Sequence, residues 1–143
     1  MISKESTVKK IQKEISSQKY DEAIKLIEHN KRNLVEIDYW YYLSLCSRYS
    51  KKYNEALVIL NNVIKIDPSY ARAYQEFGHN YFKLNNYKMS LKSYLRAVRY
   101  NPTLHASWLG ILGIKNVEQN IIDLATPVSN THLRAHETPL HRV

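Results

Sequence analysis

Histidine is the residue of this sequence best suited to holding a metal ion, and three of its six histidines lie near the C-terminal end. His132 and His136 are four residues apart, a spacing that would place both imidazoles on one face of a helix, where they could bind zinc. However, Pro127 and Pro139 flank this stretch and no helical apolar period runs through it. We therefore expect no metal site from His132, His136 and His141.

The other reactive residue types form no catalytic pattern. Cys46 lies among apolar residues in the middle of an expected helix, where a buried and inert thiol is the expected state. The remaining histidines are scattered, and His79 either contacts a ligand or is a structural residue. Three glycines are too few for a glycine-rich phosphate loop, and no serine stands in a nucleophile-elbow pattern. We expect no enzyme activity, no cofactor and no small-molecule substrate within these residues.

Composition narrows the class of protein further. The 143 residues suit one small domain, and the single cysteine excludes an intrachain disulfide, which favours a reducing compartment and a cytoplasmic location. No run approaches the ~18 apolar residues of a membrane span, and the first five residues lack the apolar core of a signal peptide. The net charge is +8, from 21 Lys and Arg against 13 Asp and Glu. This charge favours acidic partners without identifying one.

A period of 34 residues runs through the chain. Trp40, Tyr74 and Trp108 follow one another at this spacing. The segments 52–57 and 86–91 align without gaps, and an earlier copy at 19–24 lies 33 residues before the first of them. The same spacing of 34 relates several further pairs: Leu43 and Phe77, Ala56 and Ser90, Leu60 and Tyr94, Val63 and Ala97, and Pro68 and Pro102.

One period contains two expected helices. Residues 38–49 are rich in large apolar groups, a polar turn follows at 50–52, and residues 54–66 carry an apolar stripe at helical spacing. Pro68 cannot continue the second helix and suits the start of the next unit. The sequence therefore predicts an all-α solenoid of helix–turn–helix units, in which small residues allow close helix contacts. The large residues Trp40, Tyr74, Phe77 and Tyr94 would fill the spaces between the helices.

These residues resemble the tetratricopeptide repeat, a 34-residue helix–turn–helix unit. The family has an aromatic residue at the fourth place, small residues at the eighth and twentieth, and proline at the thirty-second. The resemblance implies a degenerate repeat at 4–36, full repeats at 37–70 and 71–104, and a partial repeat at 105–126. In the last of these, residues 121–124 begin to look like another second helix.

The resemblance also implies a function, because the first helices of such repeats line a concave surface that binds protein or peptide ligands. We expect a protein-binding scaffold of this kind. Tyr41 and Tyr42 either contact the ligand or only pack between helices, and both interpretations stay open. The residues that we expect to contact a peptide are Tyr42, Leu45, Tyr49, Arg72, Gln75, Glu76, His79 and Lys83.

Some members of this family hold the C-terminal carboxylate of chaperone peptides with lysines, an arginine and asparagines. The matching places here are Val8, Gln12, Tyr42, Arg72 and Glu76. Arg72 fits, but Val8 and Tyr42 supply no cation, and Glu76 would repel a carboxylate. The sequence therefore argues against a chaperone-tail adaptor.

Basic residues are concentrated in the unit 71–104. Its second helix carries Lys88, Lys92, Arg96 and Arg99, three or four residues apart on one outer face. Binding to an acidic polymer is the weaker alternative function. A solvated basic face is the plainer interpretation, and we expect neither a nucleic acid nor a membrane as partner.

Two further resemblances concern what surrounds the repeats. The segments 70–79 and 101–108 are similar to the repeat region of bacterial proteins that join these repeats to a C-terminal sulfotransferase domain. The alternative function is therefore the repeat region of such an enzyme, whose catalytic domain would be missing here. Residues 127–138 resemble a translated transposon-end sequencing adaptor, with Asn130 in place of its tyrosine. We expect 127–143 to be a non-native or disordered tail.

Overall fold

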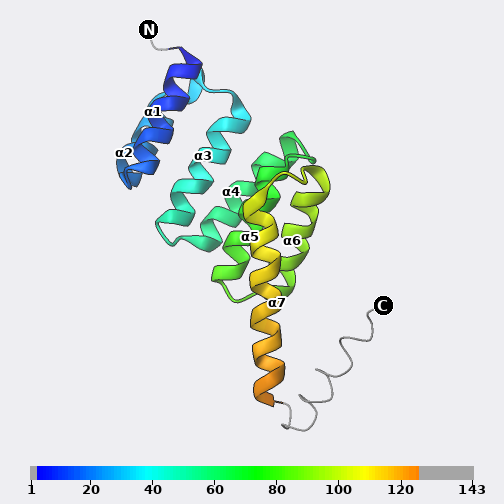
Figure 1. Cartoon of the computed structure of the whole chain (residues 1–143). Coiled ribbons are helices and arrows are strands. Elements are labelled where there is room, and N and C mark those ends of the chain that lie inside the picture. Colours follow the sequence, from blue (N-terminus) through cyan, green and yellow to red (C-terminus); the bar gives the residue numbers. More distant parts are fainter. Residues whose placement is uncertain (1–2, 126–143) are drawn as a thin grey trace.

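Helices occupy the segments for which the apolar spacing predicted them, which confirms the expected all-α repeat solenoid. The computed structural model describes residues 3–125, and no strand occurs in that range. Three helix pairs follow one another along the chain, and a longer single helix succeeds them (Figure 1). The elements are α1 (Lys4–Ser16), α2 (Tyr20–His29), the short 3₁₀-helix η1 (Lys31–Asn33), α3 (Glu36–Tyr49), α4 (Tyr53–Ile66), α5 (Ala71–Lys83), α6 (Tyr87–Tyr100) and α7 (His105–Ala125).

The turn inside each pair is built the same way three times. One residue takes a left-handed backbone with φ near +60°, and this residue is Gln18, Lys51 or Asn85. Two residues later a tyrosine begins the second helix of the pair. A left-handed residue other than glycine costs about 1–2 kcal/mol, so packing around the turn has to offset that cost.

The fourth repeat lacks such a turn. Gln119 stands where the next left-handed residue would be, yet it lies inside α7, which continues to Ala125. Residues 121–124 therefore belong to α7 and do not begin a separate helix. Ile121 stands where a tyrosine begins each earlier second helix, so the aromatic packing that accompanies the other turns is missing. Without it, the helical conformation is the more stable one for this stretch.

The connection between pairs repeats as well. The carboxylate of Asp67 accepts hydrogen bonds from the backbone and side chain of Ser69, and Asn101 accepts the same two bonds from Thr103. The Tyr74 hydroxyl donates to the Pro68 carbonyl at 2.6 Å. The corresponding donor 34 residues later is the Trp108 indole, which donates to the Pro102 carbonyl at 2.8 Å. The sequence period is therefore a period of capping bonds between consecutive units.

Small residues lie where helices approach closely. Ala56, Ser90 and Ala97 are fully buried, and the Ser90 hydroxyl donates to the Gly78 carbonyl at 2.7 Å, which joins α6 to α5. The ring of Tyr94 lies between two glycines, because a Cβ atom built on Gly78 or on Gly110 would come within 2.5 Å of it. The α5–α6–α7 contact therefore depends on the absence of two side chains.

The solenoid curves because its two layers pack differently. The first helices of neighbouring units contact one another, α1 against α3, α3 against α5 and α5 against α7. The second helices α2, α4 and α6 pack mainly on the first helices. The first helices therefore form the inner layer and the second helices the outer layer (Figure 1).

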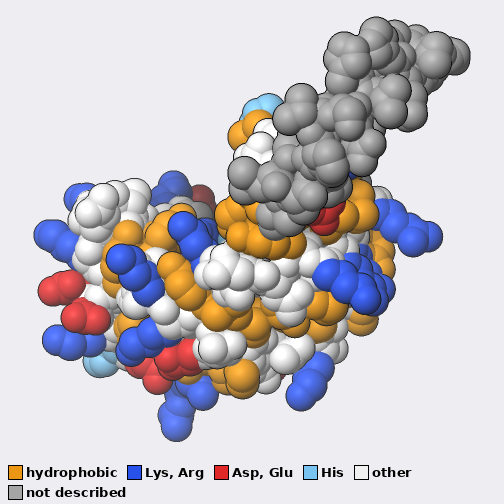
Figure 2. All heavy atoms as spheres, turned by 90° about the horizontal axis from the view of Figure 1, so that it is seen from below, with side chains coloured by type: hydrophobic (Ala, Val, Ile, Leu, Met, Phe, Trp, Pro, Cys, Tyr) orange, Lys and Arg blue, Asp and Glu red, His pale blue; other side chains and the backbone are white. Residues whose placement is uncertain are grey.

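The surface reflects the charge balance of the sequence. Figure 2 shows one face on which lysine and arginine side chains project around a central area of hydrophobic groups. None of the helices described is both long and apolar enough to cross a lipid bilayer.

Candidate functional site

A hollow of about 420 Å³ opens on the inner layer where α1, α3 and α5 meet. We call it the inner pocket. The α1 helix and the turn after it supply one side, α3 supplies the base and Arg72 of α5 closes the other side. The residues that line the inner pocket are Gln12, Ile15, Ser16, Gln18, Tyr20, Tyr41, Tyr42, Leu45, Tyr49 and Arg72.

The position of the α3 residues follows from helix geometry. Tyr41, Leu45 and Tyr49 are four residues apart, so they lie one above another on the face of α3 that looks into the pocket. Tyr41 also belongs to the hydrophobic core between α3 and α5 and is nearly buried. Tyr42 is only half-buried. Of the two interpretations left open for these tyrosines, the structure therefore supports packing for Tyr41 and leaves Tyr42 free to contact a ligand.

Aromatic rings hold one another in place around the pocket. The rings of Tyr20 and Tyr49 stack with their centroids 5.3 Å apart and their planes within 5° of parallel. The guanidinium of Arg48 lies 4.4 Å from the centroid of the Tyr49 ring. Tyr49 nevertheless keeps 42% of its surface exposed. The pocket therefore offers a pre-ordered aromatic edge that can contact a ligand at little entropic cost.

Hydrogen-bonding groups stand beside these rings. Gln12 donates from its amide nitrogen to the Tyr42 hydroxyl at 2.8 Å, across α1 and α3. Burial raises the pKa of Tyr42, so its hydroxyl stays protonated at neutral pH and can itself donate. Arg72 is exposed and forms none of the ion pairs found between described residues. The pocket thus combines rings, a hydroxyl donor, an amide and one cation.

The expected contact residues divide between the pocket and the helix interfaces. Tyr42, Leu45, Tyr49 and Arg72 come together in the inner pocket. Lys83 is exposed near the end of α5 and is not among the lining residues. The other three expected residues, Gln75, Glu76 and His79, each have a partner in a neighbouring helix.

Glu76 is buried and pairs with Arg48 of the preceding repeat. Arg48 donates from Nε to one carboxylate oxygen at 2.5 Å and from Nη2 to the other at 3.1 Å. Burial raises the pKa of Glu76, and the guanidinium of Arg48 offsets part of that rise. Only 3% of the Glu76 surface is exposed. The pair therefore joins α3 to α5 rather than facing a ligand.

This pairing changes one argument made from the sequence. Glu76 was expected to repel a peptide carboxylate, but its charge is neutralised by Arg48 and removed from solvent. The case against a chaperone-tail adaptor consequently rests only on Val8 and Tyr42, which replace cations of that carboxylate clamp.

His79 and Gln75 also serve the packing of helices. His79 Nδ1 lies 2.6 Å from the hydroxyl of Tyr94 on α6. Burial, together with the charge of Arg48, lowers the pKa of His79 to about 4, so its imidazole is neutral at pH 7. Gln75 accepts a hydrogen bond of 2.8 Å from the Ser107 hydroxyl of α7. The structural interpretation of His79 therefore accounts for its position.

Reasoning from the sequence missed the contribution of the first repeat. Gln12, Ile15, Ser16, Gln18 and Tyr20 line the pocket but were not among the expected contact residues. The recurrence of a tyrosine just after each turn was visible in the sequence. That recurrence could have placed Tyr20 beside the end of the following first helix.

The residues considered for chemistry show no reactive arrangement in the described part of the chain. Cys46 is fully buried, and burial raises the pKa of its thiol to about 11, as expected for an inert cysteine. Between residues 3 and 120 no three potential ligands gather into a metal-binding group. His132, His136 and His141 lie outside the described residues, as does the whole tail expected at 127–143.

Comparisons with known proteins agree with this architecture. Residues 71–104 match the family model of the tetratricopeptide repeat. The anaphase-promoting complex subunit 3 of Schizosaccharomyces pombe is 29% identical over 72 residues, which are 50% of this chain and 11% of that protein. This chain thus matches about a tenth of the length of that relative.

Solved structures extend the likeness to most of the helices. The first tetratricopeptide-repeat domain of human RPAP3 superimposes with a TM-score of 0.71 at 21% identity, covering 80% of this chain and 91% of that domain. The second domain of human RPAP3, solved in complex with an HSP70 peptide, gives a TM-score of 0.66 at 17% identity, covering 78% and 94%. The chain is therefore a tetratricopeptide-repeat protein, with a matched repeat at residues 71–104 within an all-α helical solenoid.

Proposed function

We propose that this chain is a scaffold that binds an extended peptide segment of a partner protein in the inner pocket and carries out no chemical step itself. The observation that carries the proposal is the pocket shared by three first helices. Its tyrosines are held by stacking and by a hydrogen bond, while one face of Tyr49 stays open to solvent. A pre-ordered aromatic surface of this kind is typical of protein-binding sites.

The shape and chemistry of the pocket favour a peptide over a small molecule. The hollow is open and shallow, and it extends from α1 across α3 to α5. The amide of Gln12 and the hydroxyl of Tyr42 suit the backbone of an extended chain, and Leu45 with the Tyr49 ring suits an apolar side chain. The peptide complex of the second RPAP3 domain supports the proposal, because that domain has the same fold.

Charge selects one feature of the ligand. Arg72 is the one cationic residue among those lining the pocket. We propose that it contacts a single acidic group of the peptide, from a side chain or from the chain end. Gln75, Glu76 and His79 are not part of the proposed contact, and Lys83 lies at its margin. We also propose that the protein acts in the cytoplasm, where its single, buried thiol would stay reduced.

Substitutions in the pocket test the proposal. Peptides would be selected from a random display library on the immobilised full chain, and their affinities measured by fluorescence anisotropy. We expect Tyr49→Ala to weaken binding by about tenfold or more, because truncating a central interface tyrosine costs over 1 kcal/mol. Arg72→Ala should weaken the peptides that carry an acidic residue and leave the others unchanged.

Lys65→Ala is the matched control, since Lys65 is an exposed cation on the outer helix α4. It should leave affinity unchanged, and no variant should lose its helical circular-dichroism spectrum. Equal affinities of the wild type and the Tyr49→Ala variant for every selected peptide would contradict the proposal.

A further inference from the structure

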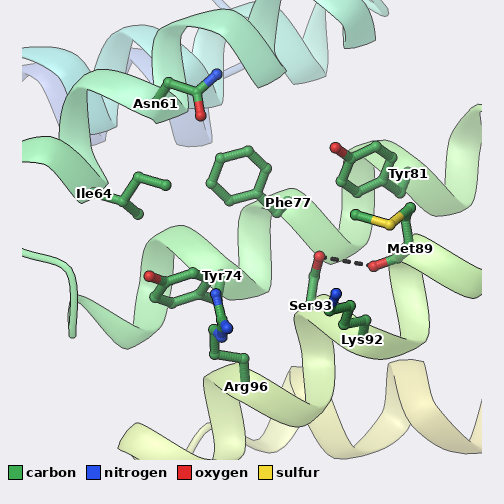
Figure 3. A pocket seen from close by; sticks show the side chains of 9 residues that line it. All are labelled: Asn61, Ile64, Tyr74, Phe77, Tyr81, Met89, Lys92, Ser93 and Arg96. Atoms are coloured by element: carbon green, nitrogen blue, oxygen red, sulfur yellow. Dashed lines mark hydrogen bonds between the residues drawn. The ribbon is translucent and has the colours of Figure 1, made fainter.

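A second hollow lies on the outer layer, between the helices α4 and α6. It has a volume of about 220 Å³, and we call it the outer groove. Figure 3 shows the ring of Phe77 pointing into it between Ile64 of α4 and Met89 of α6, with Tyr74 and Tyr81 to either side. The α5 helix therefore forms the floor of the groove, and the two outer helices form its walls.

The floor is apolar and fixed. Phe77 packs against Tyr81 with ring centroids 6.3 Å apart and against Tyr74 at 6.2 Å. Ile64 and Met89 are only half-buried, so their apolar atoms remain open to a ligand. A site of this size accommodates one apolar side chain rather than a whole helix.

The wall formed by α6 is strongly basic. Between Tyr87 and Tyr100 this helix has four cations and no carboxylate. Two of the cations, Lys92 and Arg96, line the groove and are exposed. The guanidinium of Arg96 lies 5.3 Å from the centroid of the Tyr74 ring, which holds it at the edge of the groove.

No neighbouring carboxylate neutralises these two cations. The ion pairs found among residues 3–120 are Lys9 with Glu5 and Arg48 with Glu76, and both lie away from the groove. The α4 side contributes Asn61 and Ile64, which carry no charge. The one acidic residue of α5 is Glu76, which is buried and paired. The groove is therefore an apolar slot beside two free positive charges.

We propose that the outer groove binds an acidic peptide segment of a partner protein. The segment inserts one apolar side chain between Ile64, Phe77 and Met89, and acidic residues next to it contact Lys92 and Arg96. A single-stranded nucleic acid would match the charge but not the slot, because the aromatic rings form its floor and do not stand out as stacking platforms. The groove is on the opposite layer from the inner pocket, so this proposal does not depend on the function proposed for that pocket.

Two synthetic peptides of equal charge test the proposal on the full chain. Each has eleven residues, glutamates and serines around a central position that is leucine in one peptide and serine in the other. We expect the leucine peptide to bind at least about tenfold more tightly, since a buried leucine side chain contributes over 1.4 kcal/mol. An oligodeoxythymidine of the same net charge should bind more weakly than the leucine peptide.

Protein variants locate the site. Lys92→Glu should weaken the leucine peptide by about tenfold or more, because it places a like charge beside the ligand. Lys88→Glu makes the same charge change on an exposed residue of the same helix that does not line the groove, and it should weaken binding by less than about threefold. Tyr49→Ala in the inner pocket should leave this binding unchanged, which separates the two proposals.

Three results would overturn the proposal. Equal losses from Lys92→Glu and Lys88→Glu would reduce the binding to the general charge of the helix. Equal affinities for the leucine and serine peptides would remove the apolar slot. Tighter binding of the oligonucleotide, with the same dependence on Lys92, would assign the face to a nucleic acid. Because Lys92 is exposed, its substitution leaves the fold intact, and circular dichroism checks this.

Discussion

Replacing Arg48 with methionine should destabilise the protein by about 3–5 kcal/mol at pH 8, a magnitude typical of a buried ion pair that loses one partner. Arg48 is the partner of both carboxylate oxygens of Glu76. Methionine keeps much of the apolar stem of arginine but leaves Glu76, which is 3% exposed, without a cation. Urea unfolding followed by circular dichroism measures the loss.

The loss should depend on pH, and its direction follows from linkage. Without Arg48, burial alone acts on Glu76 and raises its pKa further above that of the unfolded chain. The folded variant then binds a proton more tightly than the unfolded one, so its stability is retained at low pH. This stability is lost as the pH rises through the folded pKa of Glu76. The difference from the wild type should therefore be smaller at pH 5 than at pH 8.

Arg99→Met is the matched control, because Arg99 is exposed on α6 and belongs to neither ion pair found among residues 3–120. Its effect should stay within about 0.5 kcal/mol. A loss for Arg48→Met that is the same at pH 5 and pH 8 would contradict the assignment of the buried charge to Glu76.

Adding one methyl group at Gly110 should destabilise the protein by about 1–3 kcal/mol, the cost typical of overpacking. An alanine Cβ there would come within 2.5 Å of the Tyr94 ring. The ring cannot retreat, because Gly78 contacts it from the other helix at the same distance. The tyrosine hydroxyl is also held by His79. The gain of about 1 kcal/mol in helix propensity is therefore outweighed.

Gly113 supplies the control on the same helix. A Cβ at Gly113 meets no atom within 4 Å, so Gly113→Ala should stabilise the protein by up to about 1 kcal/mol. Thermal unfolding of the two variants measures both effects. The packing assigned to Tyr94 is wrong if Gly110→Ala and Gly113→Ala shift the melting temperature in the same direction.

The fold could be predicted from the sequence because its determinants repeat. The aromatic residues at 40, 74 and 108 and the prolines at 68 and 102 recur at the period of the structural unit. In the structure the later copies of these residues make the same capping bonds in consecutive connections. What the period could not reveal is where it stops, since the long helix α7 depends on a turn residue and a tyrosine that are not there.

The site could be predicted only in part, because a repeat register assigns faces but not partners. It placed Tyr42, Leu45 and Tyr49 on the inner layer together with Glu76 and His79. Glu76 instead meets an arginine 28 residues earlier in the chain, and His79 meets a tyrosine 15 residues later. Contacts between different helices of this kind have no fixed spacing. The degenerate first repeat hid its own pocket residues for the opposite reason, because its register was the least certain.

The central claim is that a peptide occupies the inner pocket, and an NMR titration tests it most directly. A peptide selected on the full chain would be added to isotope-labelled protein, and the shifts of backbone and tyrosine ring signals followed. The account predicts that the largest changes occur at Gln12, Tyr20, Tyr42 and Tyr49, which line the pocket. The largest changes on the outer helices α2, α4 and α6, with the tyrosine rings of the pocket unmoved, would contradict it.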